Sequence, residues 1–308
     1  MDTKWLLDFV ALAEERHFSR AAARRHVTQP AFGRRIQALE AAVGTPLVER
    51  GTSPVTLTGA GRQFHALARG LLAQLDEGLE LVRGEENALE TPIRVAAPHA
   101  LASRLLLDLL QAGAGGCRTA VEVMRVDEAA EALLDGRIDF VLGFDVMALM
   151  APPYRHLALG DGHFLLVSAP GSAGKPCFDP RVSSVPYLRY SADAYGARLI
   201  ARHNADAGLQ LAPVFETSMC QLLAEMALRG QGVAWLPDAL IEHELAAGRL
   251  AAVAPGILRI PYQVRLYRSP ARQGEAAERM WASLEARLAG NWRLLAPWRA
   301  QLADADPA

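Results

Sequence analysis

The sequence predicts an α/β protein that begins with a small all-α unit. Three observations support this fold class. Before residue 44, apolar residues recur at helical spacing in three short runs separated by polar residues. A longer run from about residue 59 to 88 keeps this spacing and predicts one long helix. Beyond Pro92, strand-like runs alternate with helical runs, which is typical of an α/β domain.

The composition allows a large core and contains a locally basic segment. The chain has 308 residues, enough for about two domains, and 51% of them are apolar. Its net charge of −2 gives no sign of a nucleic-acid partner. The segment from Arg16 to Arg62, however, carries eight arginines and two acids. This local excess fits a surface that contacts phosphates, and it equally fits an ordinary solvated helical surface.

Cysteine usage and hydropathy predict the compartment. Three cysteines without a CxxC pattern suit a reducing compartment rather than a disulfide framework. The N-terminal run contains acids and has no small-residue cleavage site, unlike a signal peptide. No run approaches the ~20 apolar residues of a membrane span. We therefore expect a soluble, cytoplasmic protein with no membrane partner.

The first two helices are short. One is predicted over residues 3–16 and the next over about 20–26. Ser19 is placed to cap the second helix, with Phe18 as a hydrophobic staple. Three consecutive alanines in this helix leave room for another helix to pack closely against it.

Thr28 is predicted to cap a third helix, with Pro30 in its first turn, and Gly44 is suited to end it. Its apolar residues form one inner stripe, made of Phe32, Ile36, Leu39 and Val43. A helix, a short turn and a second helix in this pattern form a helix-turn-helix, whose second helix enters the major groove of double-stranded DNA. The alternative is a small helical packing unit that touches no DNA.

The outer face of the third helix carries side chains suited to DNA. Gln29 and Arg34 can make bidentate contacts to base edges, whereas Thr28 and Arg35 suit phosphates. Residues 45–61 predict two short strands around a Gly/Ser/Pro turn, which form a wing beside the helices. The predicted DNA-binding residues, including one arginine in the wing, are Ser19, Thr28, Gln29, Pro30, Gly33, Arg34, Arg35 and Arg50.

The long helix is capped by Thr56 or Thr58 and carries an apolar seam close to a heptad pattern. A helix that leaves a small domain must bury such a stripe, so we predict a homodimer paired along it. A helix folded back on its own chain is the alternative. The residues of the seam are Phe64, Leu67, Leu71, Leu75 and Leu79, and a polar hinge follows at residues 85–91.

After Pro92, the order of elements predicts a parallel sheet in two α/β modules, the second inserted into the first. The predicted domains are therefore a winged helix-turn-helix over 1–58, a linker helix over 59–90, an α/β region over 91–300 and a tail over 301–308. Within the α/β region, subdomain 1 covers about 91–164 and 262–300, and subdomain 2 covers about 165–261.

Several positions in the helical unit resemble the DNA-binding signature of LysR-type transcriptional regulators. The matching residues are the alanine pair after Arg20, Gln29-Pro30, Ile36 to Glu40, Gly44, Leu47, Arg50, Leu57-Thr58 and Gly61. Residues 222–237 are also similar to a segment of that family's effector domain, so the resemblance covers nearly the whole chain. One departure is Gly33, where many members have serine. Glycine there removes a polar contact and lowers helix propensity by about 1 kcal/mol.

The resemblance implies a winged helix-turn-helix, a dimer formed by the linker helix, and a two-subdomain effector-binding domain like that of periplasmic binding proteins. It also implies assembly into tetramers or larger oligomers and RNA polymerase as a partner, with no cofactor. Residues 3–22, 190–200 and 216–237 further resemble the hypochlorite-responsive branch of the family.

A small effector is expected between the two subdomains, where strands end and helices begin. Three stretches follow predicted strands and offer hydroxyls and helix-start N–H groups. The predicted effector-binding residues are His99, Ala100, Ser103, Ser191, Thr217, Ser218 and Met219. For each residue taken alone, plain helix capping is the alternative.

An oxidant is the second kind of signal that the sequence suggests. Methionine oxidation makes an apolar side chain polar and is reversible, so it can switch a packed interface. The candidates are Met124, Met219, Met226 and Cys220, with Met219 favoured because it starts a helix beside the predicted cleft. Ordinary core packing is the alternative for Met124 and Met226, and for Cys220.

Two other classes of protein share this architecture. An enzyme would need a catalytic set, but the sequence has no GxSxG or HExxH motif and no GxGxxG after a strand. His156 and His163 lack helical ligand spacing, so we predict no catalytic residues and no metal site. A solute-binding protein would share the two lobes but needs a signal peptide, and this sequence instead carries the helical unit over residues 1–60. Among regulators, a sensor of small anions or metabolites remains the alternative to an oxidant sensor.

Overall fold

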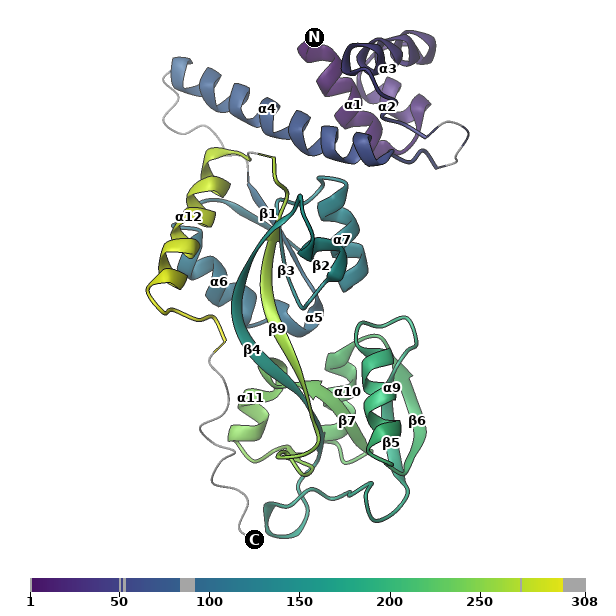
Figure 1. Ribbon diagram of the computed structural model, residues 1–308, viewed down its shortest axis with the longest axis vertical. Helices are drawn as coiled ribbons and strands as arrows, with labels where there is room; N and C mark the ends of the chain where they lie inside the picture. Colours follow the sequence, from purple (N-terminus) through teal and green to yellow (C-terminus); the bar gives the residue numbers. More distant parts are fainter. Residues whose placement is uncertain (1, 50, 52–53, 84–91, 272, 296–308) are drawn as a thin grey trace.

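The computed structural model describes residues 2–49, 51, 54–83, 92–271 and 273–295 (Figure 1). A helical unit lies at one end of an elongated molecule, and two α/β lobes follow along its length. The predicted hinge at 85–91, the predicted tail at 301–308 and the side chain of Arg50 lie outside the described residues. Among the described residues, no helix is both long and apolar enough to cross a membrane.

The helical unit contains α1 (Thr3–Glu15), α2 (Phe18–Arg24) and α3 (Gln29–Val43). The prediction that Ser19 caps α2 is wrong. The helix begins earlier, and the Nδ1 atom of His17 accepts a hydrogen bond from the Ser19 N–H at 3.2 Å. The start of α3 after Thr28 and its end at Gly44, which adopts a left-handed φ of 81°, are confirmed. Thr28 occupies the cap position, but its side chain makes no capping hydrogen bond with the described residues.

The core of the helical unit is the predicted inner stripe of α3 packed on α1. Phe32, Ile36 and Leu39 are buried there together with Phe9 and Leu12. This packing leaves the opposite face of α3 in solvent, which is the arrangement that a DNA-reading helix requires.

The predicted wing is represented among the described residues by one antiparallel bridge, Val48 to Leu57. The long helix α4 (Gly59–Arg83) follows directly. Thr58 caps this helix, because its Oγ1 accepts a hydrogen bond from the Gly61 N–H at 2.9 Å. Gly61 lies so close to the returning chain that a Cβ atom built on it would be 1.9 Å from the Leu47 carbonyl oxygen.

The two lobes share one nine-stranded sheet with the order β2-β1-β3-β9-β4-β7-β5-β6, and β8 pairs with β4. Its strands are β1 (Ile93–Ala97), β2 (Thr119–Val123), β3 (Phe140–Gly143), β4 (Arg155–Ser168), β5 (Val185–Tyr190), β6 (Leu211–Thr217), β7 (Val233–Pro237), β8 (Ala251–Ala252) and β9 (Arg259–Arg268).

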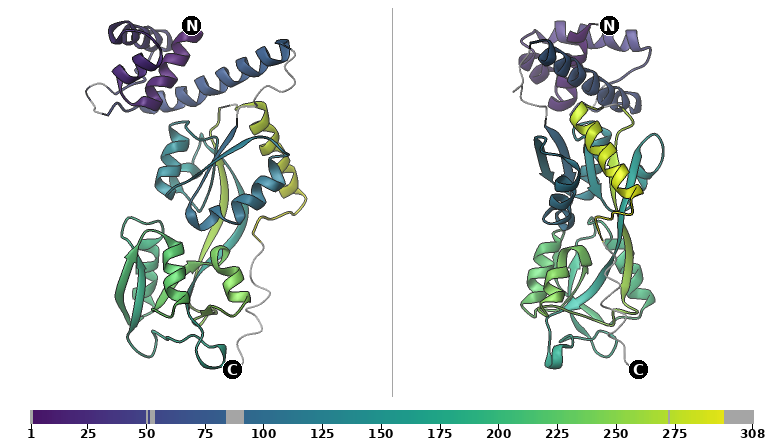
Figure 2. Two further views of the ribbon diagram at one scale, coloured as in Figure 1. Left: turned by 180° about the vertical axis from the view of Figure 1, so that it is seen from behind. Right: turned by 90° about the vertical axis from the view of Figure 1, so that its left-hand side faces the viewer.

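The predicted all-parallel sheet is wrong in its middle. The pairs β1–β2, β1–β3, β5–β6 and β5–β7 are parallel, but β9 runs antiparallel to β3 and β4. Strand β4 also runs antiparallel to β7 and β8. The reason is the insertion: the chain leaves lobe 1 along β4 and returns along β9, so the two strands run side by side in opposite directions (Figure 2).

Lobe 1 is built on β1 to β3 and lobe 2 on β5 to β8, and the long strands β4 and β9 pass through both. The lobe boundaries expected near residues 164 and 262 fall inside these two strands. Lobe 1 carries α5 (His99–Ala102), α6 (Leu105–Gly113), α7 (Val126–Leu134), α8 (Met147–Met150) and α12 (Glu275–Ala289). Lobe 2 carries η1 (Ser172–Gly174), α9 (Ala197–Asp206), α10 (Cys220–Leu228) and α11 (Asp238–Ala246).

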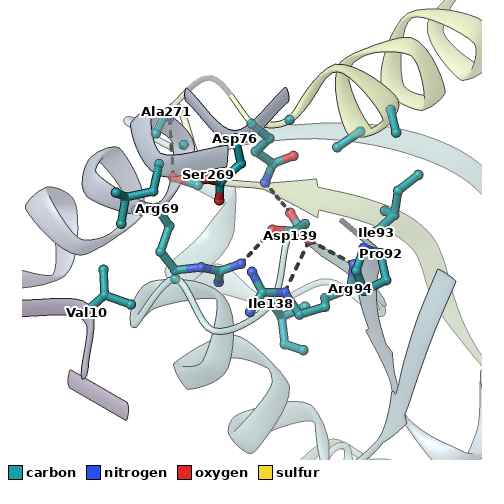
Figure 3. Close-up of a pocket in the computed structure, with 18 of the residues that line it drawn as sticks. Val10, Arg69, Asp76, Pro92, Ile93, Arg94, Ile138, Asp139, Ser269 and Ala271 are labelled. Atoms are coloured by element: carbon teal, nitrogen blue, oxygen red, sulfur yellow. Dashed lines mark hydrogen bonds and ion pairs between the residues drawn. The ribbon is translucent and has the colours of Figure 1, made fainter. Parts of the chain in front are cut away.

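The helix α4 lies across the outer end of lobe 1 and contacts it through polar groups that are half-buried or buried (Figure 3). Arg69 of α4 and Arg94 of β1 both approach the carboxylate of Asp139, at 3.3 and 3.6 Å. Beside them, the ring of His65 is fully buried and hydrogen-bonds the Asp135 carbonyl. The helical unit and lobe 1 therefore meet through a specific interface, which we call the junction.

Candidate DNA-reading helix and inter-lobe cleft

The exposed face of α3 presents most of the side chains predicted to bind DNA. Thr28, Gln29, Pro30 and Arg34 are exposed, and Gly33 is half-buried between them. Ser19 of α2 donates a hydrogen bond from its hydroxyl to Gln29 Oε1 at 3.1 Å, so these two side chains lie together at the start of α3.

Arg34 and Arg35 have different surroundings although they are neighbours. Arg34 is exposed, and it forms no ion pair with any side chain that the structure describes. Arg35 instead turns toward α1, where its Nη1 lies 3.1 Å from the fully buried carboxylate of Asp8. Arg25 of the loop after α2 holds the same carboxylate at 2.8 Å. Arg35 therefore ties α3 to α1, a role that the sequence pattern did not reveal.

Within the part of the chain that the structure describes, most of the apolar seam of α4 has no partner. Four of its leucines, which share one face, are between 41% and 46% exposed: Leu67, Leu71, Leu75 and Leu79. Phe64 differs from them, because its ring packs edge-on against Phe9 of α1 at 5.4 Å. The seam available to another molecule is therefore the leucine face beyond the first turns of the helix.

A cleft between the lobes has a volume of about 70 Å³. It lies at the ends of strands and starts of helices, as predicted. Five of the predicted effector and redox residues line it, namely His99, Ala100, Met124, Ser218 and Cys220. The predicted Ser103, Ser191, Thr217, Met219 and Met226 are not among its lining residues.

Those other residues have structural surroundings of their own. Ser103 is exposed at the end of α5, and Thr217 Oγ1 accepts a hydrogen bond from the Met219 N–H at 3.1 Å. Met219 is half-buried at the N-cap of α10, and Met226 is half-buried against the lobe core. Among the methionine candidates, Met124 is therefore the one that lines the cleft.

Arg125 spans the cleft and links the lobes. It precedes α7 in lobe 1, and its guanidinium forms an ion pair with Asp193 of lobe 2. It also donates to the Asp193 carbonyl at 2.9 Å and pairs with Asp127 at 2.9 Å. These ion pairs lower the pKa of both the Asp127 and the Asp193 carboxyl. The arrangement keeps the lobes in contact at the cleft mouth.

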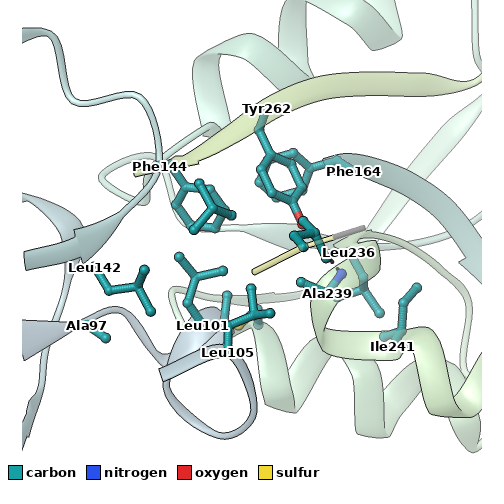
Figure 4. Packing of buried hydrophobic residues seen from close by; sticks show 14 of the residues in the cluster. Ala97, Leu101, Leu105, Leu142, Phe144, Phe164, Leu236, Ala239, Ile241 and Tyr262 are labelled. Atoms are coloured by element: carbon teal, nitrogen blue, oxygen red, sulfur yellow. Dashed lines mark hydrogen bonds between the residues drawn. The ribbon is translucent and has the colours of Figure 1, made fainter. Parts of the chain in front are cut away.

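Aromatic rings form the inner wall of the cleft. Phe144, at the end of β3, stacks on Tyr195 at 5.0 Å and contacts Phe164 of β4 at 5.8 Å. Its edge-on neighbour Tyr262 of β9 lies 5.1 Å away (Figure 4). Aromatic residues and Arg125 were missed by the sequence reasoning. Phe144 and Arg125 follow β3 and β2, so the same strand-end argument would have found them.

Burial disfavours ionisation of the Cys220 thiol. The side chain is buried, and burial raises the pKa of the thiol to about 12. Since the thiolate is the reactive species, the protonated thiol at neutral pH makes a slow nucleophile. Oxidation of Met124 does not depend on a pKa in this way, because a thioether reacts without losing a proton.

Family models match both halves of the chain. Residues 3–62 match the model described as bacterial regulatory helix-turn-helix protein, lysR family. Residues 86–289 match the model described as LysR substrate binding domain. The two matches cover the helical unit and both lobes.

Three similar proteins match over nearly the whole chain. The HTH-type transcriptional regulator YjiE of Escherichia coli K12 is 37% identical over 285 residues, 92% of this chain and 94% of that protein. The full-length structure of Salmonella typhimurium HypT, described as a hypochlorite-specific LysR-type regulator, has a TM-score of 0.61 and 37% identity over 94% of this chain and 99% of HypT. The structure of Vibrio fischeri DarR in complex with DNA has a TM-score of 0.58 and 38% identity, over 92% of this chain and 98% of DarR.

Proposed function

Because the chain belongs to the LysR family of bacterial transcriptional regulators, we propose that it reads its operator with the exposed edge of α3 and responds to a small oxidant or anion in the inter-lobe cleft. Like its family, it is a DNA-binding regulator with an effector-binding domain. The observation that carries the proposal is the helix-turn-helix, whose α3 buries one stripe and exposes Gln29 and Arg34.

The positions of these side chains on the exposed face of α3 suggest which part of the DNA each one contacts. Arg34 and Gln29 are proposed to contact base edges, and Thr28 and Ser19 to contact phosphate. Pro30 and Gly33 lie between Gln29 and Arg34 in α3. Arg50 of the wing is proposed to reach a backbone phosphate. Arg35 contributes by holding α3 on Asp8, with its guanidinium still about one-third exposed beside the DNA face.

The leucine face of α4 is proposed to pair with a second copy of the chain. Four exposed leucines on one helical face favour a coiled-coil-like contact, which fixes the distance between two α3 helices. Assembly into tetramers and contact with RNA polymerase are proposed by analogy with the family.

Arg34→Ala is expected to weaken operator binding by about 1–3 kcal/mol and to relax base preference at one position. The reason is the loss of a bidentate base contact. Fluorescence anisotropy at fixed salt, with operator and single-mismatch DNA, measures both effects.

In the same assay, DNA with two half-sites should bind the protein more tightly than DNA with one half-site, as a dimer requires.

Arg202→Ala is the matched control, because this arginine is 83% exposed on α9 of lobe 2. It should leave DNA affinity unchanged. An equal loss of affinity by Arg34→Ala on every sequence would make Arg34 a phosphate contact and refute its base-reading role.

Three observations support an oxidant or small anion as the signal. The cleft is small, and Met124 lines it together with the polar groups of His99 and Ser218. The relative HypT, which matches nearly full length, is named for hypochlorite. Hypochlorous acid would transfer its oxygen to the Met124 thioether, giving the sulfoxide, chloride and a proton. The sulfoxide oxygen is a strong acceptor that can compete with Asp193 for Arg125, which lines the same cleft.

We expect substoichiometric hypochlorite to oxidise Met124 at least as fast as Met147, followed by a change in DNA affinity that Met124→Leu abolishes. Met147 is the internal control, because it is 78% exposed and reports accessibility alone. Peptide mass spectrometry measures the order of oxidation. Preferential oxidation of Met147, or an unchanged response in Met124→Leu, would exclude Met124 as the sensor. In that case, a thermal shift by unreactive halide would favour the anion-sensing alternative.

A further inference from the structure

A second cavity lies at the junction, away from the inter-lobe cleft. It has a volume of about 260 Å³, against about 70 Å³ for the cleft. One wall comes from α1 and α4, and the other from β1, the residues that lead into β3, and the loop and first turn of α12 (Figure 3). One water needs about 10–15 Å³ of such space, so the cavity is large enough for a small organic molecule.

The two guanidiniums of the cavity are already engaged. Arg69 Nη2 lies 3.3 Å from Asp139 Oδ1, and Arg94 Nε lies 3.6 Å from Asp139 Oδ2. The Arg94 N–H donates to the same Oδ2 atom at 2.8 Å. Burial nevertheless raises the pKa of the Asp139 carboxyl, and Arg94 opposes this only in part. Further positive charge nearby would therefore stabilise the ionised carboxylate.

Gln273 supplies an acceptor that no residue described by the structure satisfies. Its side chain lines the cavity and is 91% buried, with a relative exposure of 9%. Its Nε2 donates to the Asp139 carbonyl at 2.8 Å, which fixes the orientation of the amide. The Oε1 atom is buried and has no hydrogen-bond partner among the described residues. Buried polar atoms are normally paired, so this atom indicates a missing donor.

We propose that the junction cavity binds a small organic amine in its ammonium form. The ammonium donates to Gln273 Oε1, and its charge is balanced by the Asp76 carboxylate, which also lines the cavity. The charged lining residues comprise three acids, Glu14, Asp76 and Asp139, and two arginines. Glu14 already pairs with Arg24 at 2.6 Å, and Asp139 already pairs with both lining arginines. Asp76 is exposed on α4, and it forms no ion pair with another side chain that the structure describes. The alkyl part would contact apolar side chains such as Val10, Leu72 and Ile93.

A ligand at this site would couple the two halves of the protein. It contacts α1 and α4 on one side and the sheet and α12 of lobe 1 on the other. It therefore binds only when these elements are docked, and it stabilises the docked arrangement by its affinity for that state. The site would act on the position of the DNA-reading helix independently of the inter-lobe cleft.

The test is calorimetry and thermal unfolding of the full chain with n-butylamine, and with n-butanol and butyrate as neutral and anionic comparisons. Butylamine should bind and raise the unfolding temperature, while butyrate should not. Gln273→Met keeps the length of the side chain and removes the acceptor, so it should weaken amine binding by about tenfold. Asp76→Asn, on the exposed surface of α4, should weaken binding without affecting folding.

Ser218→Ala is the matched control, because it alters the inter-lobe cleft and should leave butylamine affinity unchanged. Three outcomes would overturn the proposal. They are no binding of butylamine, equal affinity in wild type and in both Gln273→Met and Asp76→Asn, or tighter binding of butyrate than of butylamine. None of these outcomes bears on DNA reading by α3, so the two proposals fail separately.

Discussion

Gly61→Ala should destabilise the DNA-binding half by about 3 kcal/mol, the upper part of the usual range for overpacking. A Cβ atom at residue 61 would lie 1.9 Å from the Leu47 carbonyl oxygen and 2.8 Å from its carbonyl carbon. Both are backbone atoms of the chain entering the wing, so no side-chain rotation relieves the overlap. The first turn of α4 must separate from that chain, and operator affinity should fall with it. Denaturant unfolding and anisotropy measure the two effects.

Gly78→Ala is the matched control on the same helix. A Cβ atom there meets nothing within 4 Å, and the residue is exposed. Alanine has the higher helix propensity, so this variant should be stabilised by up to about 1 kcal/mol. If Gly61→Ala unfolds at the wild-type denaturant concentration and binds operator normally, the close contact between α4 and the wing chain is incorrect.

The double substitution Arg25→Met and Arg35→Met should destabilise the helical unit by about 3 kcal/mol. It leaves the carboxylate of Asp8 buried with no cation, and an uncompensated buried charge typically costs about 3–5 kcal/mol. The lower figure applies because both guanidiniums are about one-third exposed and are partly solvated already. Denaturant unfolding of the full chain, followed in the far-ultraviolet, measures the loss.

Two comparisons isolate the buried charge. Arg20→Met with Arg24→Met removes two arginines that pair with Glu14 and Glu15 at the surface, and should cost less than about 1 kcal/mol. Adding Asp8→Leu to the first double variant should recover most of the lost stability. No recovery would mean that the packing of the arginine stems, rather than the Asp8 carboxylate, accounts for the loss.

Local patterns in the sequence were sufficient to predict the helical unit. The inner stripe of α3, the start after Thr28 and the left-handed Gly44 depend on neighbours in the chain, and all three were correct. The cap of α2 was not, because His17 and Ser19 are both able to cap and the pattern does not choose between them. The sequence pattern predicts a surface position for Arg35 and does not reveal its partner Asp8, because Asp8 lies on another helix.

The sheet and the cleft were predicted only in part. Alternation of strands and helices indicates parallel neighbours, but the antiparallel pair β4–β9 arises from an insertion whose two ends are far apart in the sequence. Strand-end reasoning correctly brought His99 and Ser218 to one cleft. It could not identify the ion pair between Arg125 and Asp193, since that contact depends on how closely the two lobes approach.

The β4–β9 pair has a mechanical consequence for the regulator. The two lobes are joined by two long strands that hydrogen-bond to each other along most of their length, with one register shift between Ala158 and Gly160. Such a ribbon resists stretching and sliding because each of these motions breaks backbone hydrogen bonds. It resists bending and twisting far less. The signal that we propose for the cleft would therefore be transmitted as a torque, which changes the angle between the lobes and leaves the length of the ribbon unchanged.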